Sequence, residues 1–346
     1  MYPKELMDQA IDMAVTKETK ERFTTSYVAR QSYKPPYVVE PPSAPNVQGA
    51  IDTHCHAHQG QQDALALAKH ASKNGMGGIL FKTIAGNAPA SESVRAVDEK
   101  LRRWCDEEKI APTRLWSAYN VGRGWSDISY KEVEKALDDG CAAVWMPVFT
   151  HANTLCKVAT NRPDPENPGR FRLQGPVGWE EATKIGHYTL DEKGRLLPEV
   201  RDIIHLVADR GAVLSLGHVG REEQVEMIEE IERIGFKKCF IDHPYSPFIA
   251  LSREEMKRFA ASGVYMNFTY DELSPLLGTN PLEMFGAVAE IGVDHVLLSS
   301  DAGEPLFPDS VECMRLMRAY GEAFGMSPED VYQASAINPG RLLGAE

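Results

Sequence analysis

The sequence predicts a (β/α)8 TIM barrel, a closed ring of parallel strands, and three observations support this fold class. Apolar runs of five to eight residues recur from Gly49 onward, and amphipathic stretches with helical spacing separate them. Glycine often ends those stretches, where a helix needs a left-handed closing residue. Eight such units over roughly 275 residues suit a barrel of this kind, which usually has about 250 residues. A doubly wound open sheet is the alternative fold.

The barrel is expected to occupy residues 49–346, with each strand followed by its helix. The expected strands carry the segments GAIDTHCHA, GGILFKT, RLWSAYNVG, AAVWMPVF, AVLSLGHV, CFIDHP, VYMNFTY and HVLLSSDAG. The expected helices span residues 61–74, 91–108, 130–139, 197–210, 221–234, 253–262, 281–291 and 310–324.

The residues before the barrel, 1–48, are predicted to form an arm. Residues 4–16 carry apolar side chains at helical spacing, with Met7 and Ile11 on one stripe. Residues 17–45 contain the segments KPPY and EPPSAP, whose consecutive prolines exclude helix and favour extended backbone. Because the apolar stripe needs a partner, we expect the arm to take part in a subunit contact of a homo-oligomer.

One insertion, residues 150–196, separates the fourth strand from its helix and is too long for an ordinary βα loop. The segment HYTLDEKGRLLP near its end predicts a small hairpin that turns at Lys193 and Gly194. In a barrel the insertion would overhang the mouth as a lid, and a surface excursion without a role is the alternative. Four cations in it would either meet an anionic substrate or remain solvated: Lys157, Arg162, Arg170 and Arg172.

Composition and charge exclude several partners and locations. The formal net charge of -13, with no block of Lys and Arg, argues against nucleic acid or a membrane surface as the main partner. No run approaches roughly eighteen consecutive apolar residues, and the N-terminus lacks a basic start before an apolar core, so neither a membrane span nor an export signal is expected. The six cysteines are scattered without a CxxC pair, which predicts reduced thiols and a cytoplasmic location.

Polar side chains stand at the carboxyl ends of the expected strands, which all face one mouth of a parallel barrel. His54 and His56 have the same parity in the first strand, so both rings point to the same side. His218 and His243 end the fifth and sixth strands, and Asp301 ends the eighth. Neutral imidazoles with a carboxylate are ligands of Zn, Mn, Fe or Co. The set predicts a site for one or two divalent transition-metal ions, with zinc as the first candidate.

This pattern resembles the amidohydrolase superfamily of metal-dependent barrels, from the HxH of the first strand to the Asp of the eighth. The closing segment NPGRLLG, residues 338–344, is also similar to the end of that superfamily. The resemblance covers about residues 49–344 and concerns the superfamily rather than any substrate. The segments ILFKT, AVWMP, DEKGRLLPE, LGHV and LLSSDAG resemble those of a poorly characterised branch.

The resemblance implies a role for each of these side chains. His54, His56 and Asp301 would hold one ion. His218 and His243 would hold a second ion, or one of them would bind a single ion while the other orients the substrate. Asp301 would take the proton from an attacking water and return it to the leaving group. The ion or a nearby histidine, with His243 as the candidate, would polarise the substrate carbonyl.

Lys82, at the end of the second strand, departs from the superfamily pattern. Two-metal members often bridge their ions with a carbamylated lysine on the fourth strand, but the segment AAVWMPVFT contains no lysine. Lys82 would be a relocated carbamate, an ammonium that binds a substrate carboxylate, or a lysine that reaches the mouth without a role.

These features predict a metal-dependent hydrolase of a small carbonyl substrate, which is an amide, an ester, a thioester or a lactone. A decarboxylase or hydratase is the first alternative, because lyases occur on the same barrel with nearly the same ligands. A metal-binding protein without catalysis is the second alternative.

Other residues are placed near the mouth by position alone. They are Asn120, Arg123, Tyr245, Asn267 and Tyr270. His151 is interpreted as a loop histidine rather than a ligand, and His58 is left out of the metal site because it lies past the strand. Asp52, one layer deeper than His54, is expected to orient a ligand histidine or to pair inside the barrel. Cys55 has the opposite parity and is expected to pack in the barrel wall.

Overall fold

The computed structural model describes residues 46–57, 62–85, 88–167, 169–303 and 308–345. The predicted arm lies outside the described residues except for 46–48, and so does His58. The subunit contact of the arm therefore stays a prediction.

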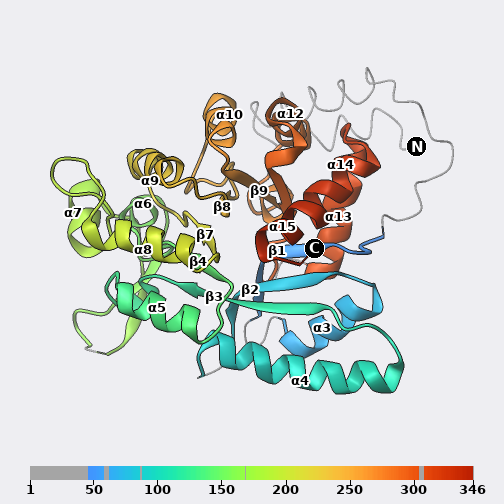
Figure 1. The fold of residues 1–346 in the computed structure, drawn as a ribbon. Helices are drawn as coiled ribbons and strands as arrows, with labels where there is room; N and C mark the ends of the chain where they lie inside the picture. The colour runs from blue at the N-terminus through green and yellow to red at the C-terminus, as the bar shows by residue number, and fades with distance from the viewer. Residues whose placement is uncertain (1–45, 58–61, 86–87, 168, 304–307, 346) are drawn as a thin grey trace, which may run out of the picture. The chain divides into compact units, whose positions relative to one another are not determined.

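Eight parallel strands form the central sheet, as the sequence predicted (Figure 1). In sheet order they are β1 (Ile51–Ala57), β2 (Gly78–Ile84), β3 (Arg114–Asn120), β4 (Ala143–Trp145), β7 (Val213–Ser215), β8 (Cys239–Asp242), β9 (Tyr265–Thr269) and β10 (Val296–Ser299). The ring closes just beyond β10, where the amide of Asp301 donates to the carbonyl of His54 and the amide of His56 donates to the carbonyl of Ala302, each over 2.8 Å. The TIM barrel is therefore confirmed.

The helices surround the strands on the outside (Figure 1). Those that follow successive strands of the barrel are α3 (Ala64–Lys73), α4 (Ala90–Glu108), α5 (Tyr130–Asp138), α8 (Pro198–Asp209), α9 (Arg221–Arg233), α10 (Arg253–Ala261), α12 (Pro281–Ile291) and α13 (Ser310–Ala323). The chain ends in α14 (Pro328–Tyr332), a π-helical turn (Gln333–Ile337) and α15 (Asn338–Leu343). Side-chain caps fix several helix starts, as where Asp63 accepts a hydrogen bond from the amide of Ala66.

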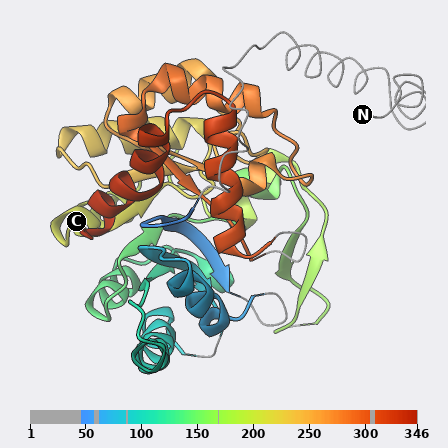
Figure 2. The ribbon, with the colours of Figure 1, turned by 90° about the vertical axis from the view of Figure 1, so that its right-hand side faces the viewer.

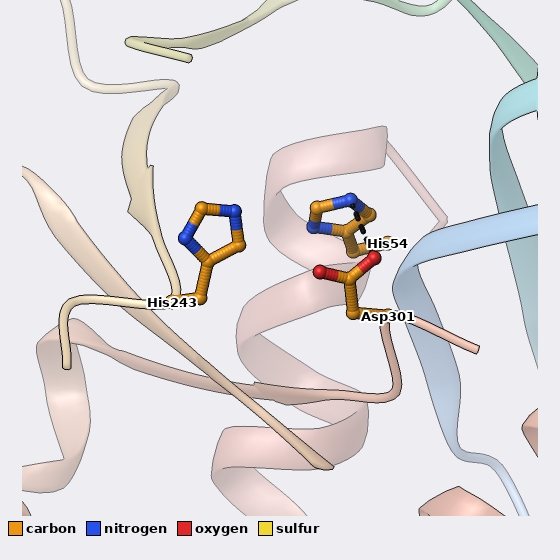
Figure 3. A group of neighbouring side chains, drawn as sticks. All are labelled: His54, His243 and Asp301. Atoms are coloured by element: carbon orange, nitrogen blue, oxygen red, sulfur yellow. Dashed lines mark ion pairs between the residues drawn. The ribbon is translucent and has the colours of Figure 1, made fainter. Parts of the chain in front are cut away.

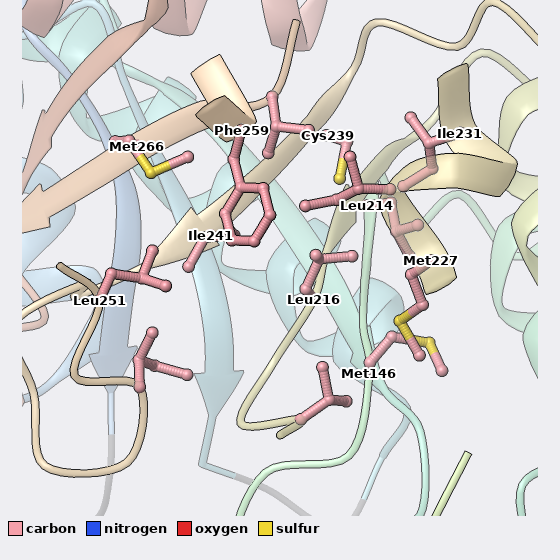
Figure 4. Packing of buried hydrophobic residues seen from close by; sticks show 14 of the residues in the cluster. Met146, Leu214, Leu216, Met227, Ile231, Cys239, Ile241, Leu251, Phe259 and Met266 are labelled. Atoms are coloured by element: carbon pink, nitrogen blue, oxygen red, sulfur yellow. The ribbon is translucent and has the colours of Figure 1, made fainter. Parts of the chain in front are cut away.

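Alternation along the strands sorts the core into an inner and an outer layer. In β8, Phe240 packs inside the barrel with Trp145, Leu80 and Leu297, whereas Ile241 faces the helices. Figure 4 shows the outer layer, in which residues of the barrel wall meet the helical residues Met227, Ile231 and Phe259. The same alternation turns Asp242, two residues after Phe240, toward the inside of the barrel.

The insertion between β4 and α8 has more regular structure than the sequence predicted. It contains α6 (Ala152–Leu155), an antiparallel hairpin of β5 (Thr160–Pro163) and β6 (Phe171–Gln174), and α7 (Trp179–Ile185). Figure 2 shows the hairpin as two light-green strands beside the barrel. The hairpin predicted at Lys193 and Gly194 is present, with an antiparallel bridge between Leu190 and Leu196. All six cysteines are free thiols. Within the described segments, every helix is too short or too polar to cross a bilayer.

Candidate metal centre

The two histidines of β1 lie side by side at the mouth, as their parity predicted. Their Nε2 atoms are 3.2 Å apart. The Nδ1 atom of His54 is 2.9 Å from Oδ1 of Asp242, and the Nδ1 atom of His56 is 2.7 Å from Oγ1 of Thr83. Both rings therefore direct Nε2 toward the same point above the barrel.

Asp301 follows β10 and completes this group. Its Oδ1 atom is 3.1 Å from Nε2 of His54 and 3.0 Å from Nε2 of His56. Its backbone φ of 50° lies in the left-handed region, which is sparsely populated by residues other than glycine and is often used at functional sites. Gly303, two residues later, has a φ of 130°, and a Cβ there would lie 2.5 Å from the carbonyl oxygen of His56. The chain thus turns sharply against β1 to present the carboxylate.

His243 and His218 approach from β8 and β7 on the other side of the mouth. Ligand atoms of His243, His54 and Asp301 lie within 4.8 Å of one another, and Figure 3 shows the three side chains around a common space. His243 also has a positive φ, of 33°, and its amide donates to the carbonyl of Asn267. The ring centre of His218 is 5.1 Å from that of His243. The structure therefore brings all five predicted ligands to one mouth.

The hydrogen bonds of two rings fix their tautomers. The Asp242 carboxylate is only an acceptor, so His54 carries its proton on Nδ1 and presents a lone pair on Nε2. The Thr154 hydroxyl donates to the carbonyl of Val148 and lies 3.0 Å from Nδ1 of His218, so its oxygen accepts from that nitrogen. His218 also presents Nε2 as a lone pair. This is the form in which histidine binds metals.

Asp242 is a positioning residue that sequence reasoning missed. It is completely buried and also accepts hydrogen bonds from Nε1 of Trp145 at 2.7 Å, the hydroxyl of Ser215 at 2.6 Å and the amide of Asn267 at 2.8 Å. Burial alone would raise its pKa, but the charge and hydrogen bond of His54, together with the charges of Lys82 and His243, hold the pKa of Asp242 well below its usual range. Its signal in the sequence was its inward parity with Phe240.

Three hydroxyl partners of the other rings were missed as well. Thr83 contacts Nδ1 of His56, Thr154 contacts His218, and Ser246 lies 2.9 Å from Nδ1 of His243. Thr83 follows Lys82 in the sequence and Ser246 lies three residues after His243, whereas no local pattern marks Thr154.

Burial favours the neutral form of three imidazoles, those of His56, His218 and His243. It lowers the pKa of both His56 and His243 to about 4, and it lowers the pKa of His218 well below its usual value. Burial would raise the pKa of Asp301, but His54, His56 and Lys82 together hold it well below its usual range. At neutral pH the imidazoles of His56, His218 and His243 are therefore neutral and the carboxylate of Asp301 is ionised.

These residues fit a divalent metal ion. Donor atoms about 2.1 Å from a tetrahedral zinc ion lie roughly 3.4 Å apart, close to the 3.0–3.2 Å among Nε2 of His54, Nε2 of His56 and Oδ1 of Asp301. Lone pairs crowded this closely repel one another unless a proton or a cation lies between them. The donor set of nitrogen and carboxylate oxygen suits Zn and other transition metals, and the spacing does not distinguish among them.

A pocket of about 530 Å³ opens beside this cluster. Its polar wall includes His56, Lys82, His218, His243, Asp271 and Asp301. Its apolar wall includes Val121, Val148, Phe149, Phe248, Leu276 and Leu277. Of the residues that were expected near the mouth from their position in the sequence, Asn120 and Arg123 line the pocket. Tyr245, Asn267 and Tyr270 do not line it. Sequence reasoning missed Asp271, whose pKa is raised well above its usual value by burial and by the charge of Asp301.

The four cations of the insertion do not line this pocket. Lys157 donates to the carbonyl of Phe248, and Arg162 donates to the carbonyl of Gly175. Arg172 lies 3.6 Å from Asp164 and 3.5 Å from Glu166. Within the described segments, the insertion contributes Thr150 to the pocket and Thr154 to the support of His218.

Three further side chains near the mouth are structural. His151 is buried and pairs with Glu223, with 2.8 Å between Nε2 and Oε1, which agrees with its interpretation as a residue other than a ligand. Asp52 accepts from the hydroxyls of Ser300 and Ser310, so it joins β1 to the end of β10 and to α13 rather than contacting a histidine ring. Cys55 is fully buried in the apolar layer outside the barrel.

The chain forms a parallel eight-stranded barrel with histidines and an aspartate at its strand ends, so the fold that the predicted resemblance implied is confirmed. The chain belongs to the family described as "Family of unknown function (DUF6282)", whose model matches residues 49–267. No curated protein matches the chain.

Solved structures of the same fold cover 86% of this chain. An amidohydrolase from Pseudomonas aeruginosa is 16% identical, with a TM-score of 0.54 and 95% of its own chain covered. The probable dipeptidase PvdM from the same organism is 13% identical, with a TM-score of 0.54 and 94% covered. A TatD homolog from Escherichia coli K12 is 16% identical, with a TM-score of 0.52 and 98% covered. At these identities the similarity concerns the fold.

Proposed function

We propose that the protein is a metal-dependent hydrolase of a small carbonyl substrate. One observation carries this proposal: Nε2 of His54, Nε2 of His56 and Oδ1 of Asp301 converge within 3.2 Å of one another on the wall of a pocket large enough for a small molecule. The printed descriptions of similar structures, an amidohydrolase and a probable dipeptidase, agree with hydrolysis.

The residues that would hold the ion are His54, His56 and Asp301, with His243 within reach of the same group. We propose zinc as this ion, because zinc is commonly bound by three or four nitrogen and oxygen donors. A bound divalent ion supplies Lewis acidity, which lowers the pKa of water and polarises a carbonyl oxygen.

Asp301 would move the proton in this reaction. Its low pKa keeps it ionised at neutral pH, and its side chain is 15% exposed toward the pocket, so it has access to a water molecule there. It would accept the proton of the attacking water and deliver it to the leaving group. His218 and His243 face the same pocket and would orient the substrate carbonyl. The apolar wall would exclude bulk water from the reacting groups.

The proposal is tested with purified protein loaded with zinc and assayed on a panel of esters, amides, thioesters and lactones. We expect bound metal by elemental analysis, hydrolysis of at least one substrate class, and a loss of about 10²–10⁴-fold in kcat/KM in Asp301→Asn. The matched control is Asp209→Asn, at an exposed position in α8, which should keep full activity.

Protein that binds no transition metal, or Asp301→Asn with undiminished hydrolysis, would contradict the proposal. Release of carbon dioxide or addition of water across a double bond, without hydrolysis, would replace it with the lyase alternative. If the metal raises the stability of the protein but no substrate is turned over, the alternative of a metal-binding protein without catalysis is favoured.

A further inference from the structure

One cation in the mouth has no part in the proposed hydrolysis. Lys82, in β2, points to the inside of the barrel, where its Nζ atom is 5.8 Å from the centre of the Trp145 ring. The residue is 5% exposed and lines the pocket, so its ammonium faces the pocket rather than bulk solvent. Its ammonium makes no hydrogen bond or ion pair with the described part of the chain.

Lys82 interacts through its charge with Asp242 and Asp301, but a buried ammonium without a direct hydrogen bond or ion pair is costly, and both carboxylates are already engaged by other groups. Asp242 accepts from four donors, and Asp301 lies against both histidines of β1. A divalent ion in the cluster would offset these two negative charges, which leaves the charge of Lys82 uncompensated. An anion that enters the pocket would supply the missing partner.

The pocket is also lined by side chains that accommodate an apolar group. Phe149 and Leu276 are each 57% exposed although both are large apolar residues, and they line the pocket with Phe248 and Leu277. Burial of such apolar surface by a ligand is favourable. A ligand that satisfies both Lys82 and these apolar side chains has an anionic group and an apolar portion.

We propose that Lys82 binds the anionic group of the substrate, so that the substrate is a small carboxylate with an apolar portion. This inference rests on the proposed function, because it takes the pocket beside the metal centre as the substrate site. Three roles for Lys82 were left open by the sequence, and this proposal selects the ammonium that binds a substrate carboxylate. A bridging carbamate would add another negative charge, and a lysine without a role would extend to solvent.

The test compares binding of 4-phenylbutanoate with that of its neutral analogue 4-phenylbutanamide, by calorimetry with zinc-loaded protein. We expect the wild type to prefer the carboxylate by about 30-fold or more, as for a desolvated charge pair. Lys82→Met should abolish the preference, and Lys82→Arg should keep part of it. Circular dichroism and thermal melting establish that each variant is folded.

Two other variants serve as controls. Arg123→Met removes a second cation that lines the pocket, and Lys157→Met removes a lysine of the insertion that does not. Both should retain the preference for the carboxylate. A preference that survives in both Lys82→Met and Lys82→Gln, or that disappears in Arg123→Met instead, would overturn the assignment.

Two further measurements separate the competing explanations. In metal-free protein the preference for the carboxylate should persist. If metal removal abolishes this preference while Lys82→Met retains it, the ion binds the carboxylate and the proposal is overturned. Carbon-13 NMR after exchange with labelled bicarbonate should show no carbamate signal that depends on Lys82; such a signal would overturn the proposal. Selective binding without hydrolysis of any substrate would contradict the proposed function alone.

Discussion

The two sides of the barrel mouth differ in the support of one histidine. Hydroxyl groups contact rings on both sides, including Thr83 beside His56, but His54 on the β1 side is held by a carboxylate. On the β1 side, His54 is held across the interior by a buried carboxylate, Asp242, which comes from β8. On the side of β7 and β8, His218 and His243 are held by hydroxyl groups, from Thr154 in the insertion and from Ser246 three residues away.

The difference indicates which part of the fold controls each ligand. Hydrogen bonds to a charged group are roughly twice as strong as those between neutral groups. The position of His54 is therefore set by the barrel itself, whereas that of His218 depends on the insertion. We expect the β1 side to be the more sensitive to the loss of its support, and the following variants measure the contrast.

Asp242→Asn should have the largest effect. The change removes a buried negative charge that four donors share, and breaking such a group typically costs about 3–5 kcal/mol in free energy of unfolding. Zinc affinity should fall about 10–100-fold, because His54 loses the partner that fixes its tautomer. Denaturant unfolding and metal titration measure both quantities. Asp202→Asn, at an exposed position in α8, is the control and should match the wild type.

Zinc removal should have the second largest effect. A ligand that binds only the folded state adds about 2.7 kcal/mol when it is present at 100 times its Kd, so chelation should lower the Tm of the wild type. The shift should be much smaller in Asp242→Asn at the same zinc concentration. An equal shift in the two proteins would show that Asp242 does not support the metal site.

Gly217→Ala should have a smaller effect, confined to the His218 side. Gly217 has a φ of 61°, and a Cβ there would lie 2.2 Å from the carbonyl oxygen of Met146, so the chain must shift. Overpacking of this kind costs about 1–3 kcal/mol. Zinc-loaded crystals of the variant should show His218 displaced and His54 unmoved. Displacement of both would mean that the two sides are not independent.

Thr154→Val should have the smallest effect, since it removes one neutral hydroxyl. We expect about 1 kcal/mol in free energy of unfolding, and a smaller loss of zinc affinity than in Asp242→Asn. The matched variant is Thr83→Val, which removes the hydroxyl beside His56 on the β1 side. A loss in Thr154→Val as large as that in Asp242→Asn would contradict the contrast between the two sides.

The sequence predicted the barrel because the strand period and the helix period can each be recognised within a short stretch of the chain. Strand and helix patterns recur in order, and the end of each parallel strand must face the same mouth, so His54, His218 and Asp301 could be placed together without coordinates. Asp242 has the right parity too, but one strand does not indicate that its carboxylate reaches a histidine on the far side of the ring.

Loop conformation accounts for most of the rest. Thr154 and Asp271 reach the site through short helical turns after their strands, whose geometry is set by tertiary packing. The cations of the insertion were considered for an anionic substrate on charge alone, yet Arg172 is placed beside acidic neighbours within its own hairpin. Charge composition alone did not determine which cation of the chain would face the pocket.

The bonds that close the barrel also have a consequence for the order of folding. His56 and Asp301 are 245 positions apart in sequence, and the hydrogen bonds that join β1 to the end of β10 lie at these same residues. A growing chain that has emerged only as far as β9 carries the four histidines of the site but not Asp301, whose carboxylate lies between them. High-affinity metal capture would therefore follow docking of the last strand, and metal uptake would report that the ring has closed.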